Sequence, residues 1–167
     1  CFRNCEFCNV RKKEGPLRVV GDIYDFWDKA SHYITIQDNN ILGEKEHFFK
    51  ICGQIKKEGL SVDFNQGLDH RLLTDDICAA LKSIKIKQLR FAFDYIEYYD
   101  TVLKAINLTN KHNLPQPFWY VYMKDNYEDA LERLLFLKRH KQTAYLMRDY
   151  SIRGIRKYNM LAYWCNK

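Results

Sequence analysis

The feature that most constrains the fold of this chain is a repeated pair of segments. In each pair, a short β-rich run is followed by a segment with helical apolar spacing. The runs predicted to form strands are YITIQ (33–37), SVDFN (61–65), LRFAF (89–93), FWYVYM (118–123) and TAYLM (143–147). Strands that alternate with helices are joined by right-handed crossovers and therefore run parallel. The sequence thus predicts an α/β fold with parallel strands, either doubly wound or rolled into a full or partial barrel.

The segments between the strands carry apolar residues three or four positions apart, as on one face of a helix. The four sets are Phe48, Ile51, Cys52 and Ile55; Ile77, Ala80, Leu81 and Ile84; Val102, Leu103 and Ile106; and Leu131, Leu134 and Leu135. Gly59 is expected to end the first helix and Thr74 to begin the second, because Gly is favoured after a helix and Thr at its N-cap.

Length and composition indicate a single domain over residues 1–167. The chain is 47% hydrophobic and 29% charged, which suffices for one apolar core. It contains no run of about 18 to 20 apolar residues that could span a membrane, and no secretory leader, so we expect a cytoplasmic protein without a membrane partner. Because the sequence starts on Cys1 and not on Met, we expect an N-terminally truncated fragment.

The net charge of +6 is spread over several short stretches, among them LKRHK (137–141) and IRGIRK (152–157). A scattered excess of this kind is more typical of a solvated surface than of a nucleic-acid footprint. RNA is therefore kept as an alternative partner and not as the first hypothesis.

Polar residues follow each predicted strand. They form the stretches QDNN (37–40), NQGLDHR (65–71), DY (94–95), MKDN (123–126) and RDYS (148–151). In a parallel α/β fold, the binding site lies at the carboxyl ends of the strands. The polar groups that converge there from five strands are what a pocket requires.

Three of the six cysteines, Cys1, Cys5 and Cys8, lie within eight residues at C-x3-C-x2-C spacing. In a cytoplasmic protein, such a cluster indicates a metal site and not disulfides. Three thiolates without a fourth clustered ligand suit either an iron–sulfur cluster with one open position or a zinc site whose fourth ligand lies elsewhere. Cys52 and Cys78 fall on apolar helix faces and are predicted to be buried thiols.

The triplet, with Phe7 just before its last cysteine and a strand–helix repeat after it, resembles the radical S-adenosylmethionine (radical SAM) superfamily. The resemblance implies a partial (β/α)6 TIM-like barrel whose first strand is missing upstream of Cys1. It implies that Cys1, Cys5 and Cys8 bind three irons of a 4Fe-4S cluster and that S-adenosylmethionine chelates the fourth. The implied activity is generation of a 5′-deoxyadenosyl radical, which abstracts hydrogen from a substrate that the sequence does not identify. The implied electron donor is of the flavodoxin or ferredoxin type.

The resemblance also implies residues that bind the cofactor. Phe7 matches an aromatic residue that packs near the adenine. The stretch ITIQDNN lies where the family's second strand ends in a glycine-rich turn that meets the methionine amino group. In this chain, Asp38, Asn39 and Asn40 occupy that turn, similar to a D-D-N variant of some branches.

Two further residues are candidates for contacts with S-adenosylmethionine. Arg71 can bind a carboxylate through two N–H groups, and the alternative is an ion pair with Asp69. Asp94 can accept hydrogen bonds from the two ribose hydroxyls, and the alternative is a cap on the helix that begins near Tyr98.

A second hypothesis is a zinc-stabilised module that binds RNA or another protein through the basic stretch IRGIRKYN (152–159). The open three-ligand centre favours the enzyme, because a binding module has no need of a labile coordination position. The aromatic residues of FDYIEYYD (93–100) and FWYVYM are predicted to lie in the core and not to stack on a base.

Overall fold

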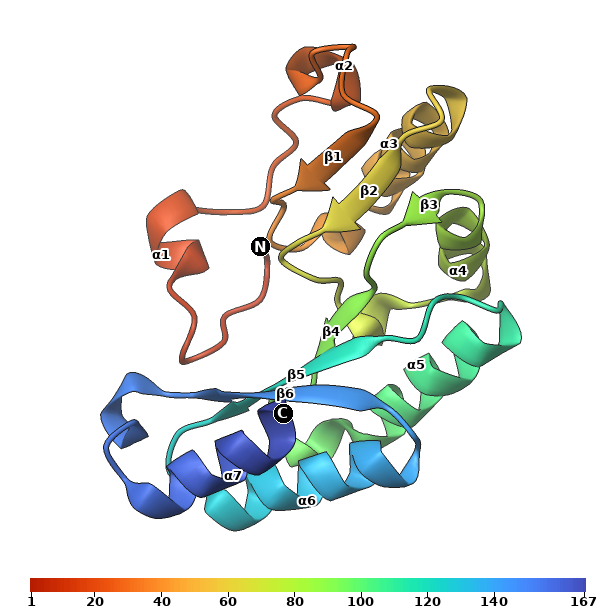
Figure 1. Ribbon diagram of the computed structural model, residues 1–167. Coiled ribbons are helices and arrows are strands. Elements are labelled where there is room, and N and C mark those ends of the chain that lie inside the picture. Colours follow the sequence, from red (N-terminus) through yellow and green to blue (C-terminus); the bar gives the residue numbers. More distant parts are fainter.

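The computed structural model describes all residues from Cys1 to Lys167, which form two three-stranded parallel sheets with helices packed on them (Figure 1). The first sheet has the order β1-β2-β3, with β1 at Tyr33–Ile36, β2 at Ser61–Phe64 and β3 at Lys85–Ile86. The second has the order β4-β5-β6, with β4 at Arg90–Ala92, β5 at Phe118–Met123 and β6 at Thr143–Arg148. The predicted α/β class with parallel strands is confirmed, but the strands do not close into a barrel.

The four predicted helices are present as α3 (Lys45–Lys57), α4 (Asp75–Lys82), α5 (Tyr99–Lys111) and α6 (Tyr127–Arg139). Three helices were not predicted, namely α1 (Val10–Glu14), α2 (Ile23–Phe26) and α7 (Arg156–Asn166). The sequence does carry a signal for α7, because Tyr158, Leu161, Ala162 and Cys165 recur at helical spacing and the first three are buried. Short 3-10 turns follow β1 (η1, Ile41–Gly43), β2 (η2, His70–Leu72), β4 (η3, Ile96–Tyr98) and β6 (η4, Tyr150–Ile152).

The two sheets are joined by residues 85–92, which contain both β3 and β4 with a bend at Lys87 between them. The Lys87 N–H donates to the Val62 carbonyl in the first sheet (2.9 Å), and the Leu89 carbonyl accepts from the Phe118 N–H in the second (2.8 Å). The run thus passes from one sheet to the other. The strand β3 was not predicted, because two residues are too few to give a periodic signal.

One apolar core serves both sheets, and its largest fully buried side chains include Phe48, Phe91, Phe93 and Trp119. Cys52 and Cys78 are buried, as predicted. Figure 1 shows α5, α6 and α7 below the second sheet and the carboxyl ends of the strands turned toward the N-terminal segment and α1. None of the helices combines the length and the apolar character that crossing a membrane requires.

The two outer strands differ at their edges. At β6, the side chain of Asn166 in α7 accepts from the Leu146 N–H (2.7 Å) and donates to the Leu146 carbonyl (3.2 Å), so α7 covers that edge. At β1, the carbonyls of His32 and Ile36 accept N–H groups from the chain of β2 (2.9 and 3.1 Å). The backbone groups of Thr35 therefore point away from the sheet, and this edge is unpaired.

Candidate functional site

A pocket of about 230 Å3 lies at the carboxyl ends of the strands, and all three clustered cysteines line it. We call it the thiol pocket. Its walls come from the N-terminal segment, the turn after β1, the turn after β2, β4 with the residues that follow it, and Tyr120 in the middle of β5. The predicted site residues that line it are Cys1, Cys5, Phe7, Cys8, Asn39, Asn40, Arg71 and Asp94.

The three thiols are free and half-buried, on a segment without helix or strand. The Cys8 N–H donates to the Cys5 carbonyl (3.0 Å), and burial raises the pKa of the Cys5 thiol. No three Cys, His, Asp or Glu side chains of the chain form a group that could hold a metal ion in this structure. The thiols therefore line the pocket without converging on one point. Because their segment belongs to no regular element, the sulfurs can draw together without breaking a helix or a strand.

Asp69 is the centre of the polar network in the thiol pocket. Its carboxylate accepts from Arg71 Nε and Nη2 (2.7 and 3.0 Å), from Arg3 Nε (2.9 Å) and from Asn40 Nδ2 (3.2 Å). Burial alone would raise the pKa of Asp69, but the two guanidinium groups outweigh burial and hold that pKa below its usual range. The ion pair with Asp69, which was the alternative predicted for Arg71, is therefore present, and it lies in the wall of the thiol pocket. Arg3 was missed, although it lies between two of the clustered cysteines.

Gly67 makes the turn that carries Asp69 and Arg71 into the pocket. Its φ of +79° is a conformation that residues with a side chain rarely adopt. A Cβ at this position would lie 3.2 Å from the Arg90 carbonyl oxygen. The same carbonyl accepts from the Leu68 N–H (2.9 Å), so the turn after β2 packs directly against β4.

Asn40 is buried, with 5% of its surface exposed, and one of its polar atoms has no partner. Its Nδ2 lies 3.2 Å from Asp69 Oδ2 and 3.9 Å from Cys1 Sγ, but Oδ1 accepts no hydrogen bond. A buried acceptor without a donor costs about 1–3 kcal/mol. A ligand that brings an N–H or ammonium group to Oδ1 would remove this cost.

Asp94 lies at the end of β4 and accepts from the Tyr122 N–H of β5 (3.2 Å). It caps no helix, because Tyr95 and Tyr98 hold the N-cap positions of η3 and α5, so the capping alternative is wrong. Burial raises the pKa of Asp94 to about 6, although the Tyr122 N–H, Arg133 and Arg71 act in the opposite direction.

We expect Asp94→Asn to stabilise the ligand-free protein at neutral pH. The folded-state pKa of about 6 lies above the ordinary value of 3.8, so the fold favours the protonated form. The stability that Asp94 contributes is complete below the ordinary pKa and is lost as the pH rises through about 6. Asn stays neutral, so the variant should gain roughly 3 kcal/mol at pH 7, at about 1.4 kcal/mol per pKa unit.

The measurement is urea unfolding of wild type and Asp94→Asn near pH 4 and at pH 7, with the exposed Asp38→Asn as control. The gain should be present at pH 7, nearly vanish near pH 4 and be absent in the control. An equal gain at both pH values would contradict the expected titration.

Phe7 links the cysteine segment to the second sheet. Its ring stacks on that of Tyr122 at 4.2 Å between centroids, and Tyr122 Oη donates to Asp149 Oδ2 (2.5 Å). Tyr122 was predicted to be a core residue, but along β5 only Trp119, Val121 and Met123 are fully buried. In FWYVYM, successive side chains point to opposite faces of the strand, so Phe and Tyr lie on one face and Trp, Val and Met on the other. This alternation is the signal that could have distinguished the half-buried face from the buried one.

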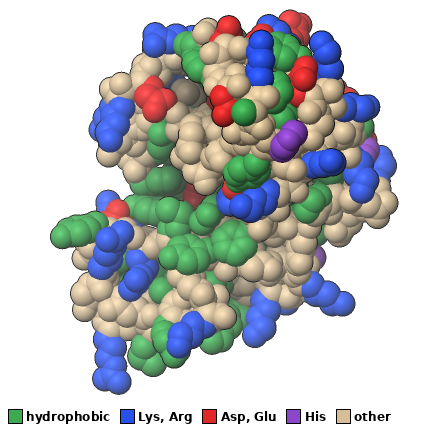
Figure 2. Space-filling model, turned by 45° about the horizontal axis from the view of Figure 1, so that its top comes forward, with side chains coloured by type: hydrophobic (Ala, Val, Ile, Leu, Met, Phe, Trp, Pro, Cys, Tyr) green, Lys and Arg blue, Asp and Glu red, His purple; other side chains and the backbone are tan.

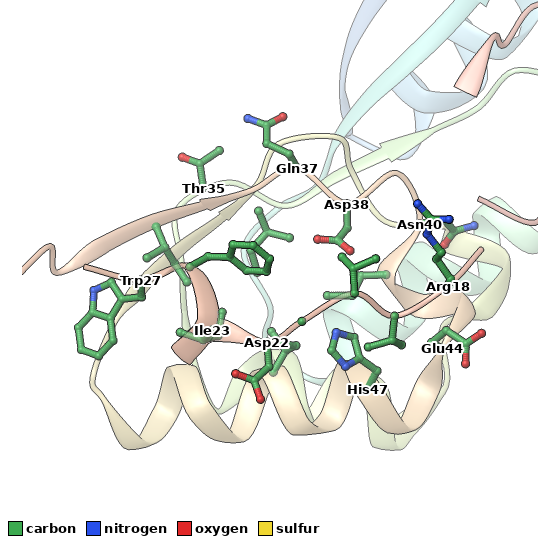
Figure 3. Close-up of a pocket in the computed structure, with 18 of the residues that line it drawn as sticks. Arg18, Asp22, Ile23, Trp27, Thr35, Gln37, Asp38, Asn40, Glu44 and His47 are labelled. Atoms are coloured by element: carbon green, nitrogen blue, oxygen red, sulfur yellow. The ribbon is translucent and has the colours of Figure 1, made fainter. Parts of the chain in front are cut away.

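A larger cavity, which we call the edge cavity, lies between β1, α3 and residues 17–28 (Figure 3). It has a volume of about 590 Å3. Asp38 and His47 point into it, as Figure 3 shows. Asp38 does not line the thiol pocket, whereas its neighbours Asn39 and Asn40 do, and Asn40 borders both cavities.

Comparison with models of known protein families, and with curated proteins, yields no match for this chain. The residues must therefore be judged by their own chemistry. The thiol pocket offers three thiols, an unpartnered amide oxygen, a guanidinium group and a carboxyl group. This set suits an iron–sulfur cluster together with a small ligand that carries ammonium, carboxylate and hydroxyl groups.

Proposed function

We propose that this chain is the core of a radical SAM enzyme, which binds a 4Fe-4S cluster and S-adenosylmethionine in the thiol pocket. The observation that carries the proposal is that Cys1, Cys5 and Cys8 share one pocket with Asn40 and Asp94, residues brought there from three separate parts of the chain. When bound, the reduced cluster and S-adenosylmethionine supply a 5′-deoxyadenosyl radical that abstracts hydrogen from substrate.

The residues of the chain would bind, orient and shield this cofactor. Cys1, Cys5 and Cys8 would hold the cluster as thiolates. The free Oδ1 of Asn40 would accept from the methionine amino group, which gives a partner to an atom that lacks one. Asp94 would accept from the ribose hydroxyls.

The roles proposed for the other two residues follow from their neighbours. Arg71 uses two of its five N–H groups on Asp69 and has others left for the methionine carboxylate. The Phe7 ring would pack near the adenine, and its stacking on Tyr122 supports this by giving the ring a fixed position.

The proposal includes a partial barrel built from both sheets. It is supported by residues 85–92, which carry the chain from one parallel sheet into the other. The edge of β1 is unpaired and has the edge cavity beside it, so the first sheet has room for a further strand there.

Anaerobic reconstitution with iron and sulfide tests the proposal. The protein should turn brown and bind roughly four irons per chain, because three clustered thiolates without a fourth suit a cluster with one exchangeable iron. Cys5→Ala should abolish the chromophore. Cys78→Ala removes a thiol that is fully buried in α4 and should leave the chromophore intact.

Iron content and visible absorption are the measurements. Tight binding of zinc without iron–sulfur absorption would support the zinc-stabilised module instead. Equal iron content in the Cys5→Ala and Cys78→Ala variants would show that the clustered thiols are not the ligands.

A further inference from the structure

The net positive charge of the chain comes from its last segment, which comprises the end of α6, β6, η4 and α7. Residues 138–167 carry Lys138, Arg139, Lys141, Arg148, Arg153, Arg156, Lys157 and Lys167 against Asp149 as the only acidic residue. The rest of the chain carries slightly more acidic than basic residues. Among the charged side chains on the face in Figure 2, those in the lower part are mainly Lys and Arg, whereas the acidic side chains gather in the upper part, together with further Lys and Arg.

These cations have no ion-pair partners. The ion pairs of the chain involve Arg3, Lys45, Lys50, Arg71, Arg90, Lys111, His112 and Arg133, and none of the basic residues of 138–167. All eight are exposed except Arg148, which is half-buried. Exposed cations without ion-pair partners are free to neutralise an external polyanion.

Aromatic side chains accompany the cations. Arg156, Met160, Tyr163 and Lys167 recur at helical spacing along the exposed face of α7, and Tyr163 is 63% exposed. Tyr150, which is 83% exposed, lies in η4 under the Arg153 guanidinium group. A membrane-binding face would present an apolar stripe, whereas alternating cations and rings suit a chain of phosphates and bases.

A second aromatic surface connects the cations to the thiol pocket. Phe118, Tyr120 and Tyr122 of β5 and Tyr145 and Met147 of β6 share one face of the second sheet, and we call it the tyrosine face. The ring of Tyr145 is 42% exposed and lies 6.0 Å from that of Tyr120, which lines the thiol pocket. The strand β6 then leads directly to Arg148 and η4.

From these observations we infer that the partner of this site is a single-stranded nucleic acid. The unpaired cations of 138–167 bind its phosphates, and the tyrosine face stacks an unpaired base beside the thiol pocket. Single strands are favoured over duplexes because a base reaches an aromatic face only when it is unstacked. That this nucleic acid is the substrate of the enzyme rests on the proposed function. Its binding can be measured without cluster or cofactor.

The test is fluorescence anisotropy of the iron-free, reduced protein with labelled single strands of about 12 nucleotides, one of RNA and one of DNA with the same sequence. Binding should weaken steeply between about 50 and about 200 mM salt. The triple variant Arg153→Gln, Arg156→Gln, Lys157→Gln should bind at least about tenfold more weakly. The slope of log affinity against log salt concentration should be shallower by about 2 in this variant, since each of the three lost phosphate contacts on a single strand contributes about 0.7.

The matched control is Lys56→Gln, Lys85→Gln, Lys104→Gln, which removes the same charge from exposed, unpaired lysines of α3, β3 and α5. It should change the affinity less than about twofold. Tyr145→Leu should weaken binding at least about fivefold at an unchanged salt slope, and Tyr145→Phe should retain it, because a base stacks on either ring.

Equal losses in the two triple variants, or an unaffected Tyr145→Leu variant, would overturn the inference. So would tight binding to vesicles of anionic lipid without binding to either oligonucleotide. A protein that binds four irons but no oligonucleotide would refute this inference alone. A protein that binds oligonucleotides but never an iron–sulfur cluster would refute only the proposed function.

Discussion

Replacing Cys8 with Ala is expected to abolish the reductive cleavage of S-adenosylmethionine. The reconstituted wild-type protein should release 5′-deoxyadenosine and methionine slowly under dithionite, even without substrate. Cleavage would need electron transfer from the cluster into the sulfonium of S-adenosylmethionine, and Cys1, Cys5 and Cys8 would hold three irons so that the fourth is left for the amino and carboxyl groups of the cofactor. With Cys8 absent, the yield of 5′-deoxyadenosine, measured by chromatography, should fall to that of a protein-free control.

The matched control for this experiment is Cys78→Ala, which makes the same chemical change outside the thiol pocket. The Cys78 thiol is fully buried, and burial raises its pKa to about 11, so it is an inert part of the core. This variant should keep the wild-type yield. If Cys8→Ala and wild type gave equal yields, the clustered cysteines would not be the catalytic centre.

Replacing Arg133 with Met is expected to be the most destabilising single change near the site. Arg133 is 2% exposed, and its guanidinium group donates to the carbonyls of Phe93 (2.6 Å) and Tyr122 (3.0 Å) and to Asp129 Oδ1 (2.7 Å). Met fills a similar volume but leaves these three acceptors without a donor. Breaking a buried ion pair from one side costs about 3–5 kcal/mol, a large share of the roughly 5–15 kcal/mol that stabilises a typical domain.

Urea unfolding of Arg133→Met and of the control Arg139→Met measures this effect. Arg139 lies on the same helix but is exposed and makes no ion pair, so its loss should cost less than about 0.5 kcal/mol. The result would bear on the site as well, because Phe93 and Tyr122 flank Asp94 and the Tyr122 N–H donates to it. Similar costs for both variants would mean that the Arg133 network contributes little.

The thiol pocket shows which parts of a site can be anticipated from sequence. Cys1, Cys5 and Cys8 stand out because three like residues lie within eight positions, and Asp94 because it follows a β-rich run. Arg3 and Arg133 give no comparable signal, since each is one cation among many. Arg3 pairs with Asp69, which is distant in the chain, and Arg133 donates to the carbonyls of Phe93 and Tyr122 on other elements as well as to Asp129 on its own helix. Asp38 lines the edge cavity, although Asn39, the next residue, lines the thiol pocket. This difference depends on the direction of the turn after β1.

The parallel α/β class, the helices α3 to α6 and the burial of Cys52 and Cys78 could all be predicted from the sequence. These features follow from apolar periodicity and caps, which depend on residues only a few positions apart. The tertiary structure alone decided that residues 85–92 join two sheets, that Asp69 gathers Arg3, Arg71 and Asn40, and that Tyr120 and Tyr145 share an open face. These features depend on strand register and on turns that bring distant residues together, and no local pattern encodes such contacts.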